Sequence, residues 1–245
     1  GGRALLFENT GTEFPVLTNM MGSERRMSMA LGVDSLDSLT RRIDSLLHEA
    51  MSPKNTLMDK LRMLPLLHDM SKWFPRKLSS RGECQQTVML GDDVDLGRLP
   101  ALTSWGCDGG PFITLPMVHT VDPESGIPNM GMYRMQIFDS RTTGMHWHRH
   151  KTGARHFDAY RRLGRRMPVT VALGGDPVYA YSATAPMPDN MDEYLLAGFL
   201  RRRPVRLVKC LTNELWVPED CDFVIEGYVD PSEELVNVIP RFECF

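Results

Sequence analysis

The sequence predicts an α+β fold in which helices come early and short strands dominate later. Apolar residues recur at helical spacing in the first eighty residues, whereas after Cys84 the chain breaks into short apolar runs separated by Gly, Pro and Asp. Two further helical patterns interrupt this later part. We therefore expect a mostly antiparallel sheet or barrel that carries two helices.

The first part of the chain predicts two strands and three helices. In order, the strands are Ala4–Phe7 and Phe14–Leu17, and the helices are Gly22–Gly32, Ser35–Met51 and Asn55–Leu64. The turn-forming run N-T-G-T separates the strands. Leucine and isoleucine recur at helical spacing in the second helix, and Pro65 is expected to end or kink the third.

Seven short strands are expected after Cys84. They are Thr87–Leu90, Phe112–Pro116, Met132–Phe138, Thr143–His150, Val169–Leu173, Val205–Lys209 and Phe223–Val229. Turns such as G-C-D-G-G-P and G-G-D-P separate them. One helix is expected from Ala154 to about Gly164, and another begins near Asn190.

Composition excludes several classes of protein. The 245 residues suffice for one large domain or two small ones, and a net charge of −3 gives no general attraction to nucleic acid or anionic membrane. Neither a membrane span nor a secretory signal is expected, because no apolar run approaches the ~20 residues that a span needs. The five cysteines are odd in number and scattered without a C-x-x-C motif, which argues against a disulfide framework or a zinc finger and fits a reducing cytoplasm.

Histidine is concentrated in one segment, M-H-W-H-R-H-K-T-G-A-R-H, which holds four of the seven histidines. Neutral imidazole is a common metal ligand and titrates near pH 7. In a strand, His146, His148 and His150 would share one face. The same alternation fits a solvent-exposed strand face, and the pattern does not decide between the two interpretations.

Two oxygen donors elsewhere could complete a metal site. Asn129 lies beside a Gly turn, and Glu193 lies in D-N-M-D-E-Y-L-L. One imidazole with amide and carboxylate oxygens suits Mn²⁺ or Mg²⁺ better than structural zinc. The spacing from Asn190 to Glu193 is also that of a helix capping box with Glu193 at its third position, and on spacing alone this interpretation is favoured.

Arg134 is a second candidate functional residue. On a strand it would share a polar face with Gln136, opposite Tyr133, Met135 and Ile137, and its guanidinium could hold a carboxylate or phosphate in a two-pronged hydrogen bond. An ordinary exposed arginine on an edge strand is the alternative, and the pattern alone favours it.

Basic residues crowd around the histidines and could hold a phosphorylated cofactor, bind nucleic acid or line a solvated helix. They are Arg149, Lys151, Arg155, Arg161, Arg162, Arg165 and Arg166. Nucleic acid is the weakest of these options, because no aromatic platform is interleaved and the chain is acidic. The phosphate-binding motif G-x-G-x-x-G does not occur, so a Rossmann dinucleotide site is not supported.

The motifs together resemble the UbiD family of decarboxylases, which use prenylated FMN, and most closely its menaquinone-biosynthesis branch. The matching segments, in order, are L-L-F-E-N, F-P-V-L-T-N-M-M-G-S-E-R-R, V-D-L-G-R-L-P, G-P-F-I-T, N-M-G-M-Y-R-M-Q, M-H-W-H-R-H-K-T-G-A, V-A-L-G-G-D-P and L-W-V-P-E-D-C-D-F-V-I-E-G. Their order makes the match far more specific than any single motif.

The resemblance implies a split β-barrel flavin-binding domain packed on a partial N-terminal α/β domain. The expected division is 1–83 for the N-terminal domain with its helical insert, 84–236 for the barrel and 237–245 for a tail unlike the family. A small-molecule carboxylic acid is the implied substrate. A homo-oligomer is the implied assembly of the full-length protein.

The resemblance also assigns site residues. Asn129, His146 and Glu193 would hold Mn²⁺ or Mg²⁺ against the flavin phosphate with K⁺ nearby, His150 being a less good match than His146. The resemblance thus favours the ligand role of Glu193 over the cap. Arg134 matches the catalytic arginine that orients the substrate carboxylate. The implied cofactor cradle also contains Gly131, Met132, Tyr133, Met145, Thr184, Ala185 and Pro186.

The implied reaction is non-oxidative decarboxylation of an aromatic or α,β-unsaturated acid, in menaquinone- or ubiquinone-type quinone biosynthesis. After V-D-P-S-E-E-L-V the family continues with an E-G-P-F-G-[DE] segment that carries two catalytic acids, whereas this chain reads N-V-I-P-R-F-E-C-F. No catalytic role is carried onto Glu233, Glu234 or Glu243. We therefore expect a fragment, truncated at both ends, that shows no decarboxylation even with prenylated FMN added.

Two other functions remain open on the sequence. The chain could be a non-catalytic module that binds flavin or metal. A metal-dependent hydrolase that uses the histidine segment is a weaker possibility and would need His148 or His150, whereas the decarboxylase interpretation needs His146.

Overall fold

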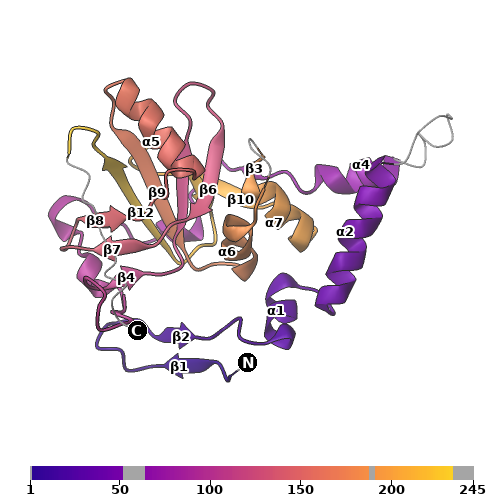
Figure 1. The fold of residues 1–245 in the computed structure, drawn as a ribbon, viewed down its shortest axis with the longest axis horizontal. Helices are drawn as coiled ribbons and strands as arrows, with labels where there is room; N and C mark the ends of the chain where they lie inside the picture. The colour runs from indigo at the N-terminus through magenta and orange to yellow at the C-terminus, as the bar shows by residue number, and fades with distance from the viewer. Residues whose placement is uncertain (1, 52–63, 188–190, 234–245) are drawn as a thin grey trace.

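The computed structural model describes residues 2–51, 64–187 and 191–233, which fold into a mixed arrangement of sheets and helices (Figure 1). The α+β composition is thus confirmed. The expected helix Asn55–Leu64 lies outside the described residues except for Leu64. The tail 237–245 lies wholly outside them. Among those residues we find no helix whose length and apolar character would let it cross a bilayer.

The N-terminal segments agree with the sequence analysis. Strands β1 (Leu5–Phe7) and β2 (Val16–Thr18) form an antiparallel pair, and helices α1 (Glu24–Leu31) and α2 (Leu36–Met51) follow. Helix α1 begins where the Ser23 side chain accepts a hydrogen bond from Arg26 N, and it ends at a left-handed Gly32. Helix α4 (Leu64–Ser71) has Pro65 in its first turn, where a missing N–H is tolerated.

The centre of the molecule is a four-stranded antiparallel sheet in the order β12-β9-β5-β6. Its strands are β5 (Met117–Val121), β6 (Pro128–Met132), β9 (Met167–Leu173) and β12 (Phe223–Val229). Side chains alternate between its faces, so Met117 and Ala172 enter one buried cluster whereas Val118 and Val171 enter another.

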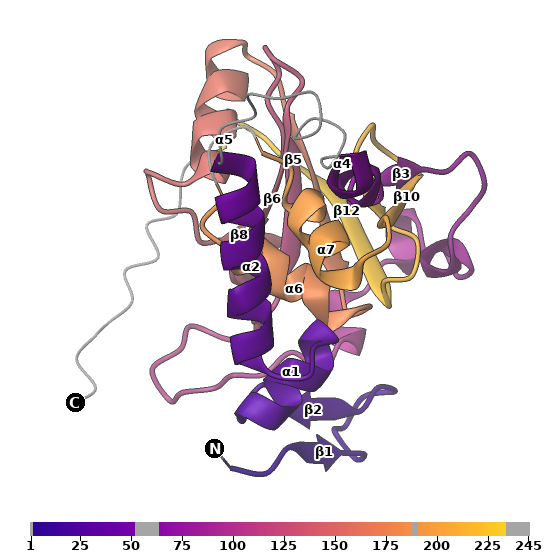
Figure 2. The same ribbon diagram turned by 90° about the vertical axis from the view of Figure 1, so that its right-hand side faces the viewer.

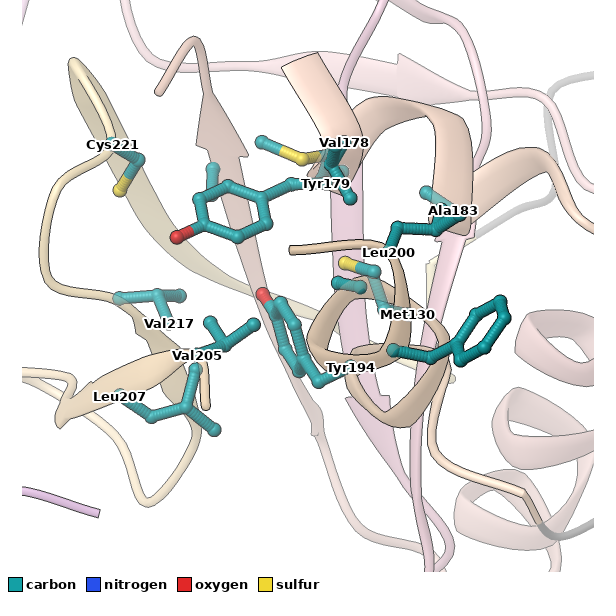
Figure 3. Close-up of a cluster of buried hydrophobic side chains, with 14 of the residues drawn as sticks. Met130, Val178, Tyr179, Ala183, Tyr194, Leu200, Val205, Leu207, Val217 and Cys221 are labelled. Carbon is teal, nitrogen blue, oxygen red and sulfur yellow. The ribbon is translucent and has the colours of Figure 1, made fainter. Parts of the chain in front are cut away.

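The two clusters join the sheet to different helices. Helix α5 (Thr152–Arg162) covers one face through Phe157 and Tyr160. Helices α6 (Pro177–Thr184) and α7 (Glu193–Arg201) cover the other, where Tyr179 and Tyr194 pack among aliphatic side chains (Figures 2 and 3). The helix lacking a clear apolar stripe, α6, was not predicted from the sequence.

Two three-stranded sheets flank the central one. The first has the order β4-β7-β8, formed by β4 (Phe112–Ile113), β7 (Met135–Ile137) and β8 (Thr143–Met145). The second has the order β11-β10-β3, formed by β11 (Trp216–Pro218), β10 (Arg206–Lys209) and β3 (Arg76–Lys77). The described strands therefore form separate sheets and not one closed barrel, and the split-barrel arrangement stays a prediction.

Several predicted strands differ from the structure. No strand forms at 87–90, which precedes the short 3₁₀ turns Gly91–Asp93 and Leu96–Arg98. The predicted strand Met132–Phe138 is interrupted at 133–134, because the chain passes there from the central sheet to the β4-β7-β8 sheet. The predicted strand Thr143–His150 ends at Met145. Tertiary pairing, which local pattern does not contain, decides each of these boundaries.

The start of α7 also corrects the sequence analysis. Its N-cap is Asp192, whose carboxylate accepts a hydrogen bond from Tyr194 N at 2.8 Å. Glu193 is therefore the first residue of the helix and not the third, so the predicted capping box with Asn190 is wrong. This frees the Glu193 side chain for another role.

Candidate cofactor and metal site

A cavity of about 290 Å³ lies where β6, α5 and α7 meet. Its wall is mostly polar and is formed by Asp122, Glu124, Ile127, Pro128, Asn129, Thr152, Arg155, His156, Ala159, Arg162, Met187, Met191 and Glu193. Two of the three predicted metal ligands, Asn129 and Glu193, are therefore on one cavity. Arg155 and Arg162 also bring part of the predicted basic cluster there.

Glu193 is held against β6. One of its carboxylate oxygens, Oε2, accepts a hydrogen bond from Met130 N at 2.8 Å. Met130 directly follows Asn129 in the chain. Burial raises the pKa of the Glu193 carboxyl to about 7. At neutral pH the group is thus poised between its two protonation states, and a bound cation would shift it to the carboxylate.

Asn129 is fixed by a polar chain that crosses to α5. Its Nδ2 donates to Thr120 Oγ1 at 3.5 Å, and that oxygen lies 2.9 Å from His156 Nδ1. Burial lowers the pKa of His156, which favours neutral imidazole, so the threonine hydroxyl can donate to Nδ1. Within the described residues no donor reaches Asn129 Oδ1. The arrangement leaves the amide oxygen, the atom that metals bind, for a ligand in the cavity.

A second polar pair fixes helix α7 behind this wall. His119 is fully buried, and burial lowers its pKa to about 4, so the ring is neutral. Its Nδ1 lies 3.2 Å from Thr170 O and donates to it, which leaves Nε2 to accept the Tyr194 hydroxyl proton at 2.5 Å. Tyr194 directly follows Glu193, so this hydrogen bond also determines where the carboxylate lies.

His146, the third predicted ligand, is placed differently. It does not line the 290 Å³ cavity. Its ring makes an edge contact with Phe112, with centroids 5.8 Å apart, and its backbone N–H donates to Arg134 O at 3.1 Å. Nε2 is buried with no hydrogen-bond partner in the described structure. Burial, and to a smaller extent Arg134 and His148, lowers the pKa of His146, which keeps the imidazole neutral as a metal ligand must be.

The next two histidines along the chain, His148 and His150, do not form a site. His148 and His150 are exposed beyond the end of β8, with ring centroids 5.8 Å apart. The expected shared strand face for the three histidines is therefore wrong. Across the described ranges, moreover, no group of three His, Cys, Asp or Glu side chains is close enough to hold a metal ion.

Arg134 lies in the link between β6 and β7 and is exposed. Its guanidinium carbon is 6.0 Å from the centroid of the Phe112 ring. Gln136, expected on the same face as Arg134, is instead buried, so the predicted alternation is wrong there. The described carboxylates make no ion pair with Arg134, which leaves both prongs of its guanidinium available to a ligand.

The predicted cradle residues occupy three places. Gly131 and Met132 end β6 and Tyr133 follows it, and the Tyr133 ring covers Gly131 so closely that a Cβ there would clash. The Tyr133 hydroxyl accepts a hydrogen bond from Gly153 N at 3.3 Å. Met145 pairs with Met135 across β7 and β8. Thr184 ends α6, and Ala185 and Pro186 follow it, just before the cavity residue Met187.

The sequence analysis missed Thr120, His119 and Asp122 as parts of this region. His119 and Thr120 lie inside the run M-V-H-T-V, where polar residues within an apolar strand are a weak signal of buried hydrogen bonding. Asp122 contributes to the wall. Its hydrogen bonds to Glu124 N and the Ser125 hydroxyl lower its pKa, so it stays a carboxylate.

Comparisons with known proteins agree with this architecture. The family model for the 3-octaprenyl-4-hydroxybenzoate carboxy-lyase Rift-related domain (UbiD) matches residues 76–238, and the model for the N-terminal domain of the same carboxy-lyase matches residues 1–46. An uncharacterised protein of Aquifex aeolicus is 45% identical over 241 residues, which cover 98% of this chain and 49% of the relative. A protein of Archaeoglobus fulgidus is 42% identical, with 97% and 48% covered.

The chain thus spans about half the length of the curated relatives that it matches. The same holds for solved structures. The UbiD-class enzyme HmfF of Pelotomaculum thermopropionicum in complex with FMN matches with a TM-score of 0.73 and 26% identity, over 94% of this chain and 46% of that one. An evolved dimeric form of HmfF with prFMN gives 0.75 and 26%, over 94% and 48%.

Vanillic acid decarboxylase of Sedimentibacter hydroxybenzoicus, in its closed form, shares the fold at a TM-score of 0.72 and 23% identity, over 91% of this chain and 44% of that one. The family models cover most of the chain, and two relatives exceed 40% identity over nearly all of it. The chain therefore belongs to the UbiD family.

Proposed function

We propose that the whole protein is a carboxy-lyase that removes CO₂ from an aromatic or α,β-unsaturated acid with the help of prenylated FMN. The observation that carries this proposal is the convergence of Asn129 and Glu193, from β6 and α7, on one polar cavity. The complexes of HmfF with FMN and prFMN, at 26% identity, support a flavin as the cofactor.

The donor atoms suit a hard divalent cation. Asn129 Oδ1 and the Glu193 carboxylate are oxygen ligands of the kind that Mn²⁺ and Mg²⁺ prefer, and His146 Nε2 is a neutral, buried nitrogen without a partner. We propose these three groups as the metal ligands, with K⁺ bound nearby. A cation there would neutralise Glu193 and favour an adjacent phosphate.

Other residues of the chain would position cofactor and substrate. Arg155 and Arg162 line the cavity and suit a phosphate, whereas the exposed fork of Arg134 suits a substrate carboxylate. Prenylated FMN, when bound, supplies the electron sink that loss of CO₂ requires. The chain's own contribution is orientation and charge compensation.

Finer features of the proposal rest on the branch that the sequence resembles. A role in menaquinone- or ubiquinone-type quinone biosynthesis, a homo-oligomeric assembly, the split barrel and the division at residue 83 belong here as proposals. So does a cytoplasmic location, which the scattered cysteines favour.

A binding experiment on the 245-residue chain tests the proposal. The chain freed of metal is titrated with Mn²⁺, followed by electron paramagnetic resonance, and with FMN, followed by quenching of flavin fluorescence. We expect one Mn²⁺ site that Glu193→Gln weakens strongly, and FMN binding that Mn²⁺ strengthens. His148→Ala is the matched control. The proposal would be contradicted if the chain failed to bind Mn²⁺ or failed to bind FMN.

A second assay separates the alternatives. In the whole protein supplied with prenylated FMN, CO₂ release that Arg134→Lys abolishes would distinguish a carboxy-lyase from a non-catalytic flavin-binding module. Hydrolysis that a chelator removes and flavin does not affect would instead favour a hydrolase. The exposed positions of His148 and His150 give that function no structural support.

A further inference from the structure

Two cysteines that are far apart in the sequence lie together beside β11, and neither lines the candidate cavity. Cys84 is in the 3₁₀ turn Glu83–Gln85, and Cys221 is in the link between β11 and β12. Both thiols donate to the same carbonyl oxygen, that of Pro218, at 3.5 Å from Cys84 Sγ and 3.1 Å from Cys221 Sγ. The two sulfur atoms therefore face a common point.

The backbone holds the two segments in this relation. Cys84 N donates to Glu219 O at 3.0 Å, and the Gln85 side chain donates to Lys209 O at 2.7 Å. Gly82 approaches Glu219 so closely that a Cβ at Gly82 would clash with the Glu219 backbone. A covalent link between the sulfur atoms needs their segments to be close already, and these contacts meet that need.

The two thiols differ in access and acidity. Cys84 is partly exposed, whereas Cys221 is 3% exposed and is labelled among the core side chains in Figure 3. When Cys84 ionises, the Cys221 thiol can turn to donate to its thiolate, which lowers the pKa of Cys84, and the same contact, together with burial, raises the pKa of Cys221. The thiolate is the reactive form of cysteine. Because Cys84 is both more acidic and more accessible than Cys221, we expect an oxidant in solvent to react with Cys84 first.

We propose that Cys84 and Cys221 form a peroxide-sensitive modification site that closes into an intramolecular disulfide. The Cys84 thiolate attacks one oxygen of hydrogen peroxide, the O–O bond breaks, and hydroxide leaves Cys84 as the sulfenic acid. Cys221 sulfur then attacks Cys84 sulfur, the S–O bond breaks, and the oxygen leaves as water with the Cys221 proton. In sum, two thiols lose two electrons and two protons, and one peroxide becomes two waters.

A neighbouring cysteine provides an internal contrast. Cys210 is buried, its thiol donates to Thr170 Oγ1 at 3.4 Å, and burial raises its pKa to about 12. It therefore has the inert character of a core thiol. It serves as the matched control for the pair.

The disulfide would restrain a segment that supports the candidate site. The residues around Cys221 hold α6 and α7, because Asp220 accepts a hydrogen bond from the Tyr179 hydroxyl at 2.9 Å and lies 3.7 Å from Arg201. Asp222 accepts from Gly175 N at 3.1 Å. A cross-link that closes a long loop is expected to raise the melting temperature by about 5–10 °C.

The test uses the whole 245-residue chain, reduced and then treated with hydrogen peroxide, alkylated and mapped by mass spectrometry. We expect a peptide linking Cys84 to Cys221, a higher melting temperature, and reversal of both by dithiothreitol. Cys210→Ser should behave as the wild type. In Cys221→Ser, Cys84 should remain a sulfenic acid that dimedone traps.

Three outcomes would overturn the proposal. The first is a Cys84 sulfenic acid that persists in the wild type while Cys221 stays a free thiol. The second is linkage of Cys84 to a cysteine other than Cys221. The third is a Cys84 that stays reduced at peroxide concentrations that oxidise exposed methionines. Trapping by dimedone in the wild type keeps the test decisive if Cys221→Ser does not fold.

Discussion

Two regions of the molecule contain the three proposed metal ligands and Arg134, and they are built differently. The first, the Asn129 wall, comprises Thr120, Asn129, His156 and Glu193, each hydrogen-bonded to another element. The second, the His146 rim, comprises Arg134, His146, His148 and His150, whose side chains are exposed or, at His146 Nε2, buried without a partner.

The difference shows which part of the site is positioned by the folding of the core. Wall residues lie in or at the ends of core elements, so the packing that forms the sheet also positions their polar atoms. Rim residues follow the ends of β6 and β8 and make few side-chain hydrogen bonds. We expect the wall to determine affinity and stability, and the rim to become ordered only around a ligand.

The largest effect is expected from His119, whose hydrogen bond to Tyr194 holds α7 next to the Asn129 wall. His119 has a folded pKa of about 4 against 6.5 for the free side chain, so its neutral form stabilises the protein fully above pH 6.5. That stability is lost as the pH falls from 6.5 toward 4, and the full loss is about 3 kcal/mol. Urea unfolding at several pH values should show this slope, and His119→Gln should reduce it. An unchanged slope in the variant would show that His119 is not the source.

Loss of the wall carboxylate should have the next largest effect. Glu193→Gln keeps the shape but removes the charge, so Mn²⁺ affinity should fall by more than about 100-fold, beyond the usual cost of losing a supporting group. Because burial raises the pKa of Glu193 to about 7, Mn²⁺ binding to the wild type should release protons and tighten as the pH rises toward 7. Equal affinity in variant and wild type would exclude Glu193 as a ligand.

A smaller effect is expected from the residue that orients Asn129. Thr120→Val keeps the side-chain shape but removes the hydroxyl between Asn129 Nδ2 and His156 Nδ1. We expect a loss of Mn²⁺ affinity of about 10-fold, at the lower end for supporting residues, because Asn129 itself remains. Isothermal titration calorimetry measures this. If Thr120→Val bound Mn²⁺ as weakly as Glu193→Gln does, or more weakly, the variant would have lost the structure of the Asn129 wall and not only the orientation of Asn129.

The smallest effect should come from His148 in the His146 rim. His148→Ala removes an exposed side chain whose only close aromatic neighbour in the described structure is His150. The free energy of unfolding should change by no more than about 0.5 kcal/mol, and Mn²⁺ affinity should not change. His146→Ala is the informative partner, because a drop in affinity there alone would show that the buried Nε2 joins the wall when metal binds.

Strong local periodicity was enough to predict much of the fold. Helix α2 follows its leucine spacing, and strand β12 coincides with the predicted Phe223–Val229. Strand β5 was missed because its buried polar residues His119 and Thr120 interrupt the apolar pattern that marks a core strand. The break at 133–134 was missed because it arises from a change of sheet, which depends on contacts distant in sequence.

The site divides in the same way. Asn129 and Glu193 were first considered as oxygen donors from their residue types, and motif resemblance, which carries information about function that periodicity lacks, then favoured them as ligands. The chain from Asn129 through Thr120 to His156 joins three elements through side-chain hydrogen bonds, and no local pattern encodes such a chain. The positions of His146 and Arg134 were wrongly expected because both were placed on continuous strands that end before them.

Strand β5 carries a consequence for anyone who alters this protein. His119 and Thr120 are neighbours that point to opposite faces, one toward Tyr194 on α7 and the other toward His156 on α5. Inserting or deleting a single residue in Met117–Val121 would exchange the two sides and disconnect both helices at once. Length in this strand is accordingly a stricter constraint than side-chain identity, and libraries that vary its residues should keep its frame intact.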